Sequence, residues 1–221
     1  MVLPKNLVFD LGGVLIDLNV NGMLEGFADV GLDARRFMAD STDSTATTVC
    51  EGMSMGKLLS DYQMGLFSTE ELLHVVLPEC SEGITAEQLI RAWNGCLCSI
   101  PPERLAMIRS LREEGYRTYM LSNTNDLHWQ HIVAHDFAAD GLGVDDVFDG
   151  VFLSHEMHLA KPDARIYKAV LREIGAEPRD CFFVDDARVN VEAARHEGIE
   201  AHWLNLEEED IVHMMARIME H

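Results

Sequence analysis

The sequence is short of basic residues and of long apolar runs. It has 17 lysines and arginines against 38 aspartates and glutamates, which gives a formal net charge of -21. Such a chain repels polyanions and anionic membrane surfaces, so nucleic acid is not an expected partner. No apolar stretch approaches the ~20 residues that span a bilayer, and no basic segment precedes an apolar one at the N-terminus. We therefore expect a cytoplasmic protein.

Cysteines with the spacing of a zinc site are also lacking. The chain has five cysteines, an odd number, and a single residue separates Cys96 from Cys98. Structural zinc sites use pairs separated by about two to four residues. The pattern therefore indicates ordinary thiols in a reducing compartment. A small phosphorylated substrate stays compatible with the acidic composition if local cations or a metal ion reverse the field inside one cleft.

Strand and helix patterns alternate along most of the chain. With 221 residues, 48% of them apolar, it can build a full hydrophobic core. Strands are predicted at 6–10, 117–122, 149–153, 180–184 and 199–204, with helical periodicity between the later ones. Gly115, Gly175 and Gly198 fall where helices should stop. This alternation predicts an α/β fold with a doubly wound parallel sheet.

Residues 18–97 interrupt the alternation. They show helical patterns punctuated by Gly, Ser and Thr, with the clearest helices at 69–76 and 86–97. Ser68 and Glu71 fit a capping box at the start of the first of these. We predict an all-helical insertion at 18–97 in an α/β core formed by 1–17 and 98–221. Its predicted hinges are 17–19 and 99–102.

Four polar motifs stand at the carboxyl ends of predicted strands or shortly after them. Asp10 ends the first strand and is followed by a glycine turn. The other three, in chain order, are Ser122-Asn123, Lys161-Pro162 and Asp185-Asp186. Each alone is also explained as a turn residue, a helix cap or a loop. Ligands bind at the carboxyl ends of strands in open α/β sheets, so together the motifs predict one site.

This series resembles the haloacid dehalogenase-like (HAD) superfamily. It is most similar to bacterial phosphatases of the α-glucose-1-phosphate phosphatase type, which share D-L-G-x-V, S-N-T-N, K-P-x-A-R-I-Y and D-D motifs. The matching segments here are 10–14, 122–125, 161–167 and 185–186. The resemblance covers most of the chain and is weakest in 18–97. In the family, an insertion at this place is a helical cap over the active site.

The resemblance implies a Mg2+-dependent phosphatase acting on a small phosphorylated metabolite, such as a sugar phosphate. Asp10 would be the nucleophile that forms an aspartyl-phosphate, which water then hydrolyses. Lys161 and Mg2+ would balance the negative charge.

The resemblance also assigns the ligands. Asp10, the backbone carbonyl of Gly12 and Asp186 would hold Mg2+, with Asp185 either a direct ligand or beside them. The hydroxyl group of Ser122, with Asn123, would bind the phosphate. Asn190 stands where many relatives carry a further acid.

Gly12 departs from the commonest phosphatase pattern. Many relatives place a second Asp two residues after the nucleophile, where it acts as general acid and base. Positioned proton transfer is worth ~100- to 10,000-fold, so its loss hurts most with poor leaving groups. We therefore hypothesise a preference for better leaving groups, such as an anomeric sugar hydroxyl, over simple alkyl phosphates. This predicts faster turnover of sugar-1-phosphates than of sugar-6-phosphates.

Three other functions are compatible with part of this pattern. A haloacid dehalogenase uses the same nucleophile on carbon, but it needs no metal and typically lacks the acidic pair that is present at 185–186. A sugar-phosphate mutase needs the acid that Gly12 lacks. A catalytically weak binding or regulatory protein would lack Mg2+-dependent turnover, and Gly12 is the feature that favours it.

Two further patterns received structural interpretations. His128, His131 and His135 have helical spacing, but histidines on a polar helix are more often surface or packing residues than metal ligands. The acidic run at 207–210 is predicted to form the first turn of an amphipathic closing helix.

Overall fold

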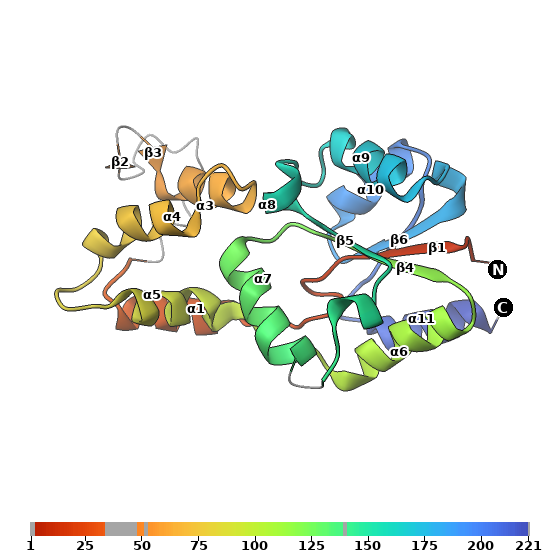
Figure 1. The fold of residues 1–221 in the computed structure, drawn as a ribbon, viewed down its shortest axis with the longest axis horizontal. Helices are drawn as coiled ribbons and strands as arrows, with labels where there is room; N and C mark the ends of the chain where they lie inside the picture. Colours follow the sequence, from red (N-terminus) through yellow and green to blue (C-terminus); the bar gives the residue numbers. More distant parts are fainter. Residues whose placement is uncertain (1–2, 34–47, 51–52, 139–140, 221) are drawn as a thin grey trace.

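A five-stranded parallel sheet lies at the centre of the core (Figure 1). The computed structural model describes residues 3–33, 48–50, 53–138 and 141–220. The strand order is β5-β4-β1-β6-β7. In chain order the strands are β1 (Asn6–Phe9), β4 (Arg117–Ser122), β5 (Gly150–Leu153), β6 (Cys181–Asp185) and β7 (Glu200–Trp203). Every predicted strand is confirmed to within one residue at each end.

Helices cover both faces of this sheet. Leu7 and Phe9 of β1 pack in one apolar cluster with α6 (Pro102–Glu113) and α11 (Ile211–Met219). Val8 packs in another with α9 (Ala164–Ile174) and α10 (Arg188–His196). Figure 1 shows these two pairs of helices on opposite sides of the sheet. Because β1 is buried on both faces, its apolar run is continuous, and the predicted doubly wound fold is confirmed.

The predicted helix ends are also found. Gly175 ends α9 in the left-handed conformation, at φ 66°, which favours glycine. Gly115 and Gly198 follow the ends of α6 and α10. The prediction for the closing helix was wrong in one respect, because α11 begins at Ile211, after the acidic run. Asp210 accepts a hydrogen bond from the His213 N–H, which makes it the N-cap outside the helix.

A largely helical segment connects β1 to α6. Its described helices are α1 (Val20–Asp29), α3 (Met55–Gln63), α4 (Thr69–Val76), α5 (Ala86–Trp93) and the short 3-10 helices η1 (Leu77–Glu79) and η2 (Asn94–Cys96). The segment has its own apolar cluster, in which Trp93 makes edge-on ring contacts with Phe27 and Tyr62. The capping box of Ser68 and Glu71 is confirmed. The helix predicted at 86–97 ends earlier, at Trp93, and continues as η2.

The segment is not entirely helical. A two-stranded antiparallel sheet joins β2 (Thr48–Cys50) to β3 (Met53–Ser54), where only helices were predicted. Runs of two or three residues are too short for periodicity to reveal, although Thr48 and Val49 are β-branched. The rest of the predicted insertion between α1 and α3, at 34–47 and 51–52, lies outside the described residues.

The two connections between this segment and the core run side by side. Leu18 and Leu97 form an antiparallel bridge. The Asn19 N–H donates to the Cys96 carbonyl at 2.7 Å, and the Cys98 N–H donates to the Asp17 carbonyl at 3.1 Å. The chain therefore leaves and re-enters the core at adjacent points.

Two core helices also contact the helical segment. The Thr69 hydroxyl donates to Asp126 at 2.6 Å, at the start of α7 (Asp126–Ile132). Ser154, which begins α8 (Ser154–Met157), donates its hydroxyl to the Gln63 carbonyl at 2.6 Å. Figure 1 shows α7 lying between the sheet and the α1–α5 pair. In the part of the chain described here, no helix combines the length and apolar character needed to cross a membrane.

Candidate active site

Asp10 lies directly beyond the end of the central strand. Its N–H donates to the Val184 carbonyl at 2.9 Å, so the residue still follows the line of β1 beside β6. Asp10 as a whole residue is 8% exposed. Its carboxylate is held through one of its two oxygens. Oδ1 accepts the Leu11 N–H at 2.7 Å and lies 2.8 Å from Lys161 Nζ. Because both contacts fall on Oδ1, Oδ2 is the oxygen that neither of them holds.

The Lys161 ammonium group is buried among oxygen acceptors. Nζ lies 2.8 Å from Asp10 Oδ1, 2.6 Å from Asp185 Oδ2 and 3.0 Å from the Leu121 carbonyl. These three acceptors match the three donors of an ammonium group. Burial lowers the pKa of Lys161, but the attraction of Asp10 and Asp185 outweighs it and leaves the pKa raised. The charged amine is therefore locked beside the Asp10 carboxylate.

Asn123 fixes the backbone of this lysine. Its Nδ2 donates to the Lys161 carbonyl and its Oδ1 accepts the Lys161 N–H, both at 2.8 Å. This reciprocal pair spends both ends of the amide side chain on positioning Lys161. The expected contact of Asn123 with phosphate stays a prediction. The neighbouring residue Ser122 is buried at the end of β4.

Asp185 is held by several donors at once. Besides Lys161 at Oδ2, it accepts the Ala187 N–H at 2.8 Å and the Asn190 amide at 3.1 Å on both oxygens. Asn190, at the position where many relatives carry a further acid, therefore donates hydrogen bonds to Asp185. With both of its oxygens engaged, Asp185 is placed to orient Lys161.

Asp186 completes an acidic cluster. One carboxylate oxygen each from Asp10, Asp185 and Asp186 can be chosen so that all lie within 4.8 Å of one another. The Asp186 carboxylate packs against Gly13, which has φ 74°, and a Cβ on that glycine would lie 2.4 Å from Asp186 Oδ2. Gly13 is thus required both by its backbone conformation and by the closeness of Asp186.

The electrostatics of the cluster fit a hard divalent cation. Burial raises the pKa of Asp10 to about 7, although Lys161 opposes the shift; Asp185 adds to it. Burial, with the neighbouring Asp185, also raises the pKa of Asp186. Three carboxylates face one ammonium group, so further positive charge would stabilise their ionised forms. Oxygen-only donors of this kind suit Mg2+.

The position where many relatives carry a second Asp lies against an apolar side chain. A Cβ on Gly12 would lie 3.1 Å from Leu18 Cδ1. Residue 12 therefore offers neither a proton donor nor space for one without movement of Leu18.

The three histidines of the helical pattern do not come together. His128 is packed among Trp93, Cys96 and Asn125, while the rings of His131 and His135 stack at 4.1 Å. Within the described ranges, the acidic trio is the one group of His, Cys, Asp or Glu side chains arranged to hold a metal ion. The interpretation of the three histidines as packing and surface residues agrees with these contacts.

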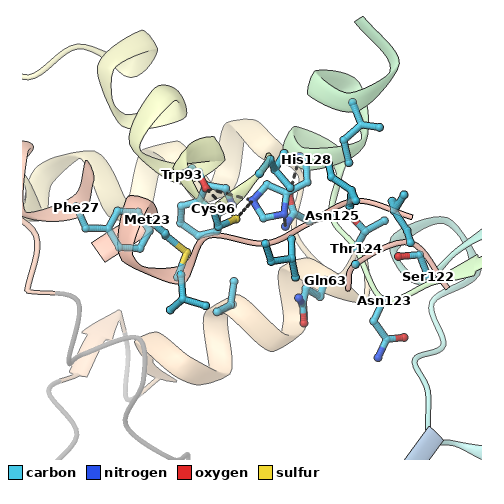
Figure 2. Close-up of a pocket in the computed structure, with 18 residues that line it drawn as sticks. Met23, Phe27, Gln63, Trp93, Cys96, Ser122, Asn123, Thr124, Asn125 and His128 are labelled. Atoms are coloured by element: carbon cyan, nitrogen blue, oxygen red, sulfur yellow. Dashed lines mark hydrogen bonds between the residues drawn. The ribbon is translucent and has the colours of Figure 1, made fainter. Parts of the chain in front are cut away.

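A cavity of about 260 Å³ lies beside the loop that follows Asp10 and beside the end of β4 (Figure 2). Gly12, Ser122 and Asn123 form part of its wall, and Met23, Phe27 and Trp93 of the helical segment form another part. Figure 2 shows Ser122 and Asn123 at one end and Phe27 and Met23 at the other. The sequence did not predict this cavity, because the apolar residues that line it have the spacing of ordinary core positions.

Comparisons with known proteins agree with this geometry. The chain is 26% identical to D-ribitol-5-phosphate phosphatase of Bacteroides thetaiotaomicron over 89% of each chain. It is 27% identical to a sesquiterpene phosphatase of Aspergillus oryzae over 88% of this chain and 87% of that one. A HAD family enzyme of B. thetaiotaomicron, solved with magnesium and inorganic phosphate, is 32% identical and superposes with a TM-score of 0.83, covering 96% of this chain and 98% of that one.

Residues 4–198 match the haloacid dehalogenase-like hydrolase family. The similarity to α-glucose-1-phosphate phosphatases in particular stays a prediction. The family match and the shared fold together place the chain: it is a member of the haloacid dehalogenase-like hydrolases.

Proposed function

We propose that this hydrolase is a Mg2+-dependent phosphatase that cleaves a small phosphate monoester through an aspartyl-phosphate on Asp10. The observation that carries the proposal is the buried pairing of Asp10 with Lys161, with Asp186 beside them. The phosphatase names of two relatives support the same reaction, and a similar structure was solved with magnesium and phosphate.

Each residue has a role that its contacts support. Asp10 Oδ2, the oxygen not held by Leu11 or Lys161, attacks phosphorus while the P–O bond to the leaving alcohol breaks. Lys161 stabilises the charge that develops on the phosphoryl oxygens, and the Ser122 hydroxyl donates to them. Water then hydrolyses the aspartyl-phosphate, releasing phosphate and restoring Asp10.

Mg2+, held by Asp10, Asp186 and the Gly12 carbonyl, would supply positive charge at the phosphoryl group. Asp185 and Asn123 would act by positioning Lys161, since their polar groups are taken up by that residue and its neighbours. An aliphatic leaving group receives no proton from residue 12, which is why better leaving groups are expected to react faster.

We propose the predicted division of the chain as well. Residues 18–97 would be the cap, while 1–17 and 98–221 would form the catalytic core, and the cavity between Ser122 and Phe27 supports this division. Cys80, Cys96, Cys98 and Cys181 are free thiols, which supports the proposed cytoplasmic location. A dehalogenase is less favoured because it needs no acidic metal cluster.

The test is release of p-nitrophenol from p-nitrophenyl phosphate, with Mg2+ or with EDTA. This substrate has a good leaving group and tolerates the absence of a general acid. We expect turnover with Mg2+, loss of turnover in EDTA, and a decrease of at least about 1,000-fold in Asp10→Asn, which removes the nucleophile.

The matched control is Asp29→Asn, the same chemical change at an exposed position of α1. It should retain full turnover. Activity that persists in EDTA, or in folded Asp10→Asn, would contradict the proposal and revive the dehalogenase or binding-protein interpretations.

A further inference from the structure

The walls of the cavity beside the catalytic residues are mostly apolar. One part of the wall is formed by apolar side chains from the helical segment and its connections, namely Leu18, Met23, Phe27, Leu59, Trp93 and Leu97. None of the residues lining it in the described part of the chain is Lys, Arg, Asp or Glu. The described residues of the wall therefore offer no charged group that could bind a second phosphate or a carboxylate.

Two of the polar residues in the wall, His128 and Asn125, are bonded to each other, and a third, Asn123, is bonded to the backbone of Lys161. His128 Nε2 lies 3.2 Å from the Trp93 carbonyl, which can only accept, so this nitrogen carries the proton. The other ring nitrogen, Nδ1, then accepts a hydrogen bond from the Asn125 side-chain amide at 3.2 Å. The backbone N–H of His128 donates to Asn125 Oδ1 at 3.1 Å. Burial lowers the pKa of His128 to about 4, so the ring is neutral near pH 7.

Such a wall disfavours a polyhydroxylated ligand. Each sugar or polyol hydroxyl that enters leaves its water partners, and few free polar groups replace them. Gln63, Ser122 and Thr124 are polar exceptions, and Figure 2 shows all three toward the Asn123 end of the cavity rather than the Phe27 end. An apolar group gains free energy from the same transfer out of water.

The cavity reaches Ser122, the residue proposed to donate to the phosphate, although Asp10 and Lys161 are not among the residues that line it. Gly12, Ser122 and Asn123 belong to its wall, so a phosphate held at Ser122 would direct its ester group toward Met23 and Phe27. An apolar protein cavity of about 150 Å³ holds benzene. By proportion, a volume of about 260 Å³ accommodates roughly ten carbon atoms.

We infer that the substrate is a phosphate monoester of an apolar alcohol of up to roughly ten carbons, whose hydrocarbon part fills this cavity. The inference rests on the proposed phosphatase function. It departs from two expectations of the sequence, namely a sugar phosphate and a preference for better leaving groups over simple alkyl phosphates, because apolar binding of the leaving group raises kcat/KM separately from its departure. The cavity acts on specificity, since it binds the group that leaves rather than the phosphoryl group that is transferred.

The test compares substrates with closely similar primary alcohol leaving groups. Pentyl phosphate and ribitol 5-phosphate both have five carbons and a primary phosphate ester, and they differ in their remaining hydroxyl groups. We expect kcat/KM to be at least about tenfold higher for pentyl phosphate. In the series from ethyl to dodecyl phosphate, kcat/KM should rise by up to about fourfold per methylene group and level off near ten carbons.

Two variants locate the effect. Met23→Gln, which keeps the length of the side chain, should lower kcat/KM for octyl phosphate more than for ethyl phosphate. Leu66→Gln is the matched control, because Leu66 is 57% exposed and lies outside the cavity lining. This control should preserve the chain-length dependence of the natural protein.

A binding measurement gives a readout independent of turnover. Calorimetry with octylphosphonate in the presence of Mg2+ should show tighter binding than methylphosphonate and a more negative heat-capacity change, the mark of apolar burial. Met23→Gln should reduce this difference, and Leu66→Gln should not.

The outcomes separate the two proposals. If p-nitrophenyl phosphate is hydrolysed but ribitol 5-phosphate matches or exceeds pentyl phosphate, the inference is overturned while the phosphatase function stands. A flat chain-length series would overturn it in the same way. If no phosphate ester is hydrolysed at all, the proposed function fails and the inference about its substrate fails with it.

Discussion

At the scale of single residues, Lys161 shows how a charged group is kept inside the protein. Asp10, Asp185 and the Leu121 carbonyl surround its ammonium group, and Asn123 holds its backbone. The sequence predicted Lys161 and the acids from their order along the chain. It could not predict that Asn123 binds a backbone 38 residues away, because this pairing depends on how two loops meet.

Gly13 supports a prediction at the same scale. In Gly13→Ala the new Cβ would lie 2.4 Å from Asp186 Oδ2, at a positive φ that alanine avoids. The backbone conformation should cost about 1–2 kcal/mol of unfolding free energy. Displacement of Asp186 should also weaken apparent Mg2+ affinity about 10- to 100-fold, as loss of a group that orients a metal ligand does. Urea unfolding and Mg2+ titration of activity measure the two effects.

Gly175→Ala is the matched control, since its φ of 66° is similar and nothing lies within 4 Å of the added Cβ. It should lose similar stability and keep its Mg2+ affinity. Equal Mg2+ affinities in the two variants would show that Gly13 does not position the acidic cluster.

At the scale of elements, α7 joins the core to the helical segment. Its Leu127 N–H donates to the Tyr62 hydroxyl at 3.2 Å, and its His128 ring donates to the Trp93 carbonyl. The other ring nitrogen of His128, Nδ1, accepts a hydrogen bond from the Asn125 amide at 3.2 Å, and this contact requires the neutral imidazole. Burial lowers the pKa of His128 to about 4, which keeps the ring neutral near pH 7. Protonation would place an unpaired charge where α7 and η2 meet.

The depressed pKa predicts a pH dependence of stability. An unfolded histidine has a pKa near 6.5, so between about pH 6.5 and 4 the unfolded state binds more protons than the folded state. Stability contributed by His128 is therefore complete above about pH 6.5 and lost as the pH falls toward 4. We expect His128 to account for about 2 kcal/mol of lost unfolding free energy between pH 7 and pH 5.

Urea unfolding of His128→Gln measures this contribution. The variant should be less stable at pH 7 but lose about 2 kcal/mol less than the natural protein on going to pH 5. His74→Gln, at an exposed position of α4, should keep the natural pH dependence. A natural pH dependence in His128→Gln would rule out the neutral histidine as its source.

The elements differ in how far the sequence reveals them. The central strands β1 and β6 were predicted closely because strands buried on both faces give unbroken apolar runs, as in Val8 and its neighbours. The boundaries of α4 followed from the Ser68 capping box, a local signal. The β2–β3 pair and the cavity were missed because both depend on how short or distant segments meet in space.

At the scale of the whole molecule, the excess of acidic residues should act in opposite directions on the two ligands. A net charge of -21 attracts Mg2+ and repels a phosphate monoester. Raising NaCl from about 10 to 100 mM shortens the screening length from about 30 to 10 Å. We expect the apparent Kd for Mg2+ to rise severalfold, while KM for the phosphate ester at saturating Mg2+ falls.

Steady-state kinetics at two salt concentrations measure both quantities, and KCl in place of NaCl controls for a specific ion effect. A shift of both constants in the same direction would show that general ion competition at the site, rather than the field of the whole chain, dominates.

The paired connections at Leu18 and Leu97 have a consequence for how this enzyme type diversifies. The helical segment begins and ends at neighbouring backbone positions, so its length and shape are decoupled from the placement of Asp10 and Lys161. A different helical cassette can be spliced in at the same junction, provided that it meets α7 and α8. New leaving groups can thus be acquired by exchange of one segment, while the machinery for phosphoryl transfer is inherited unchanged.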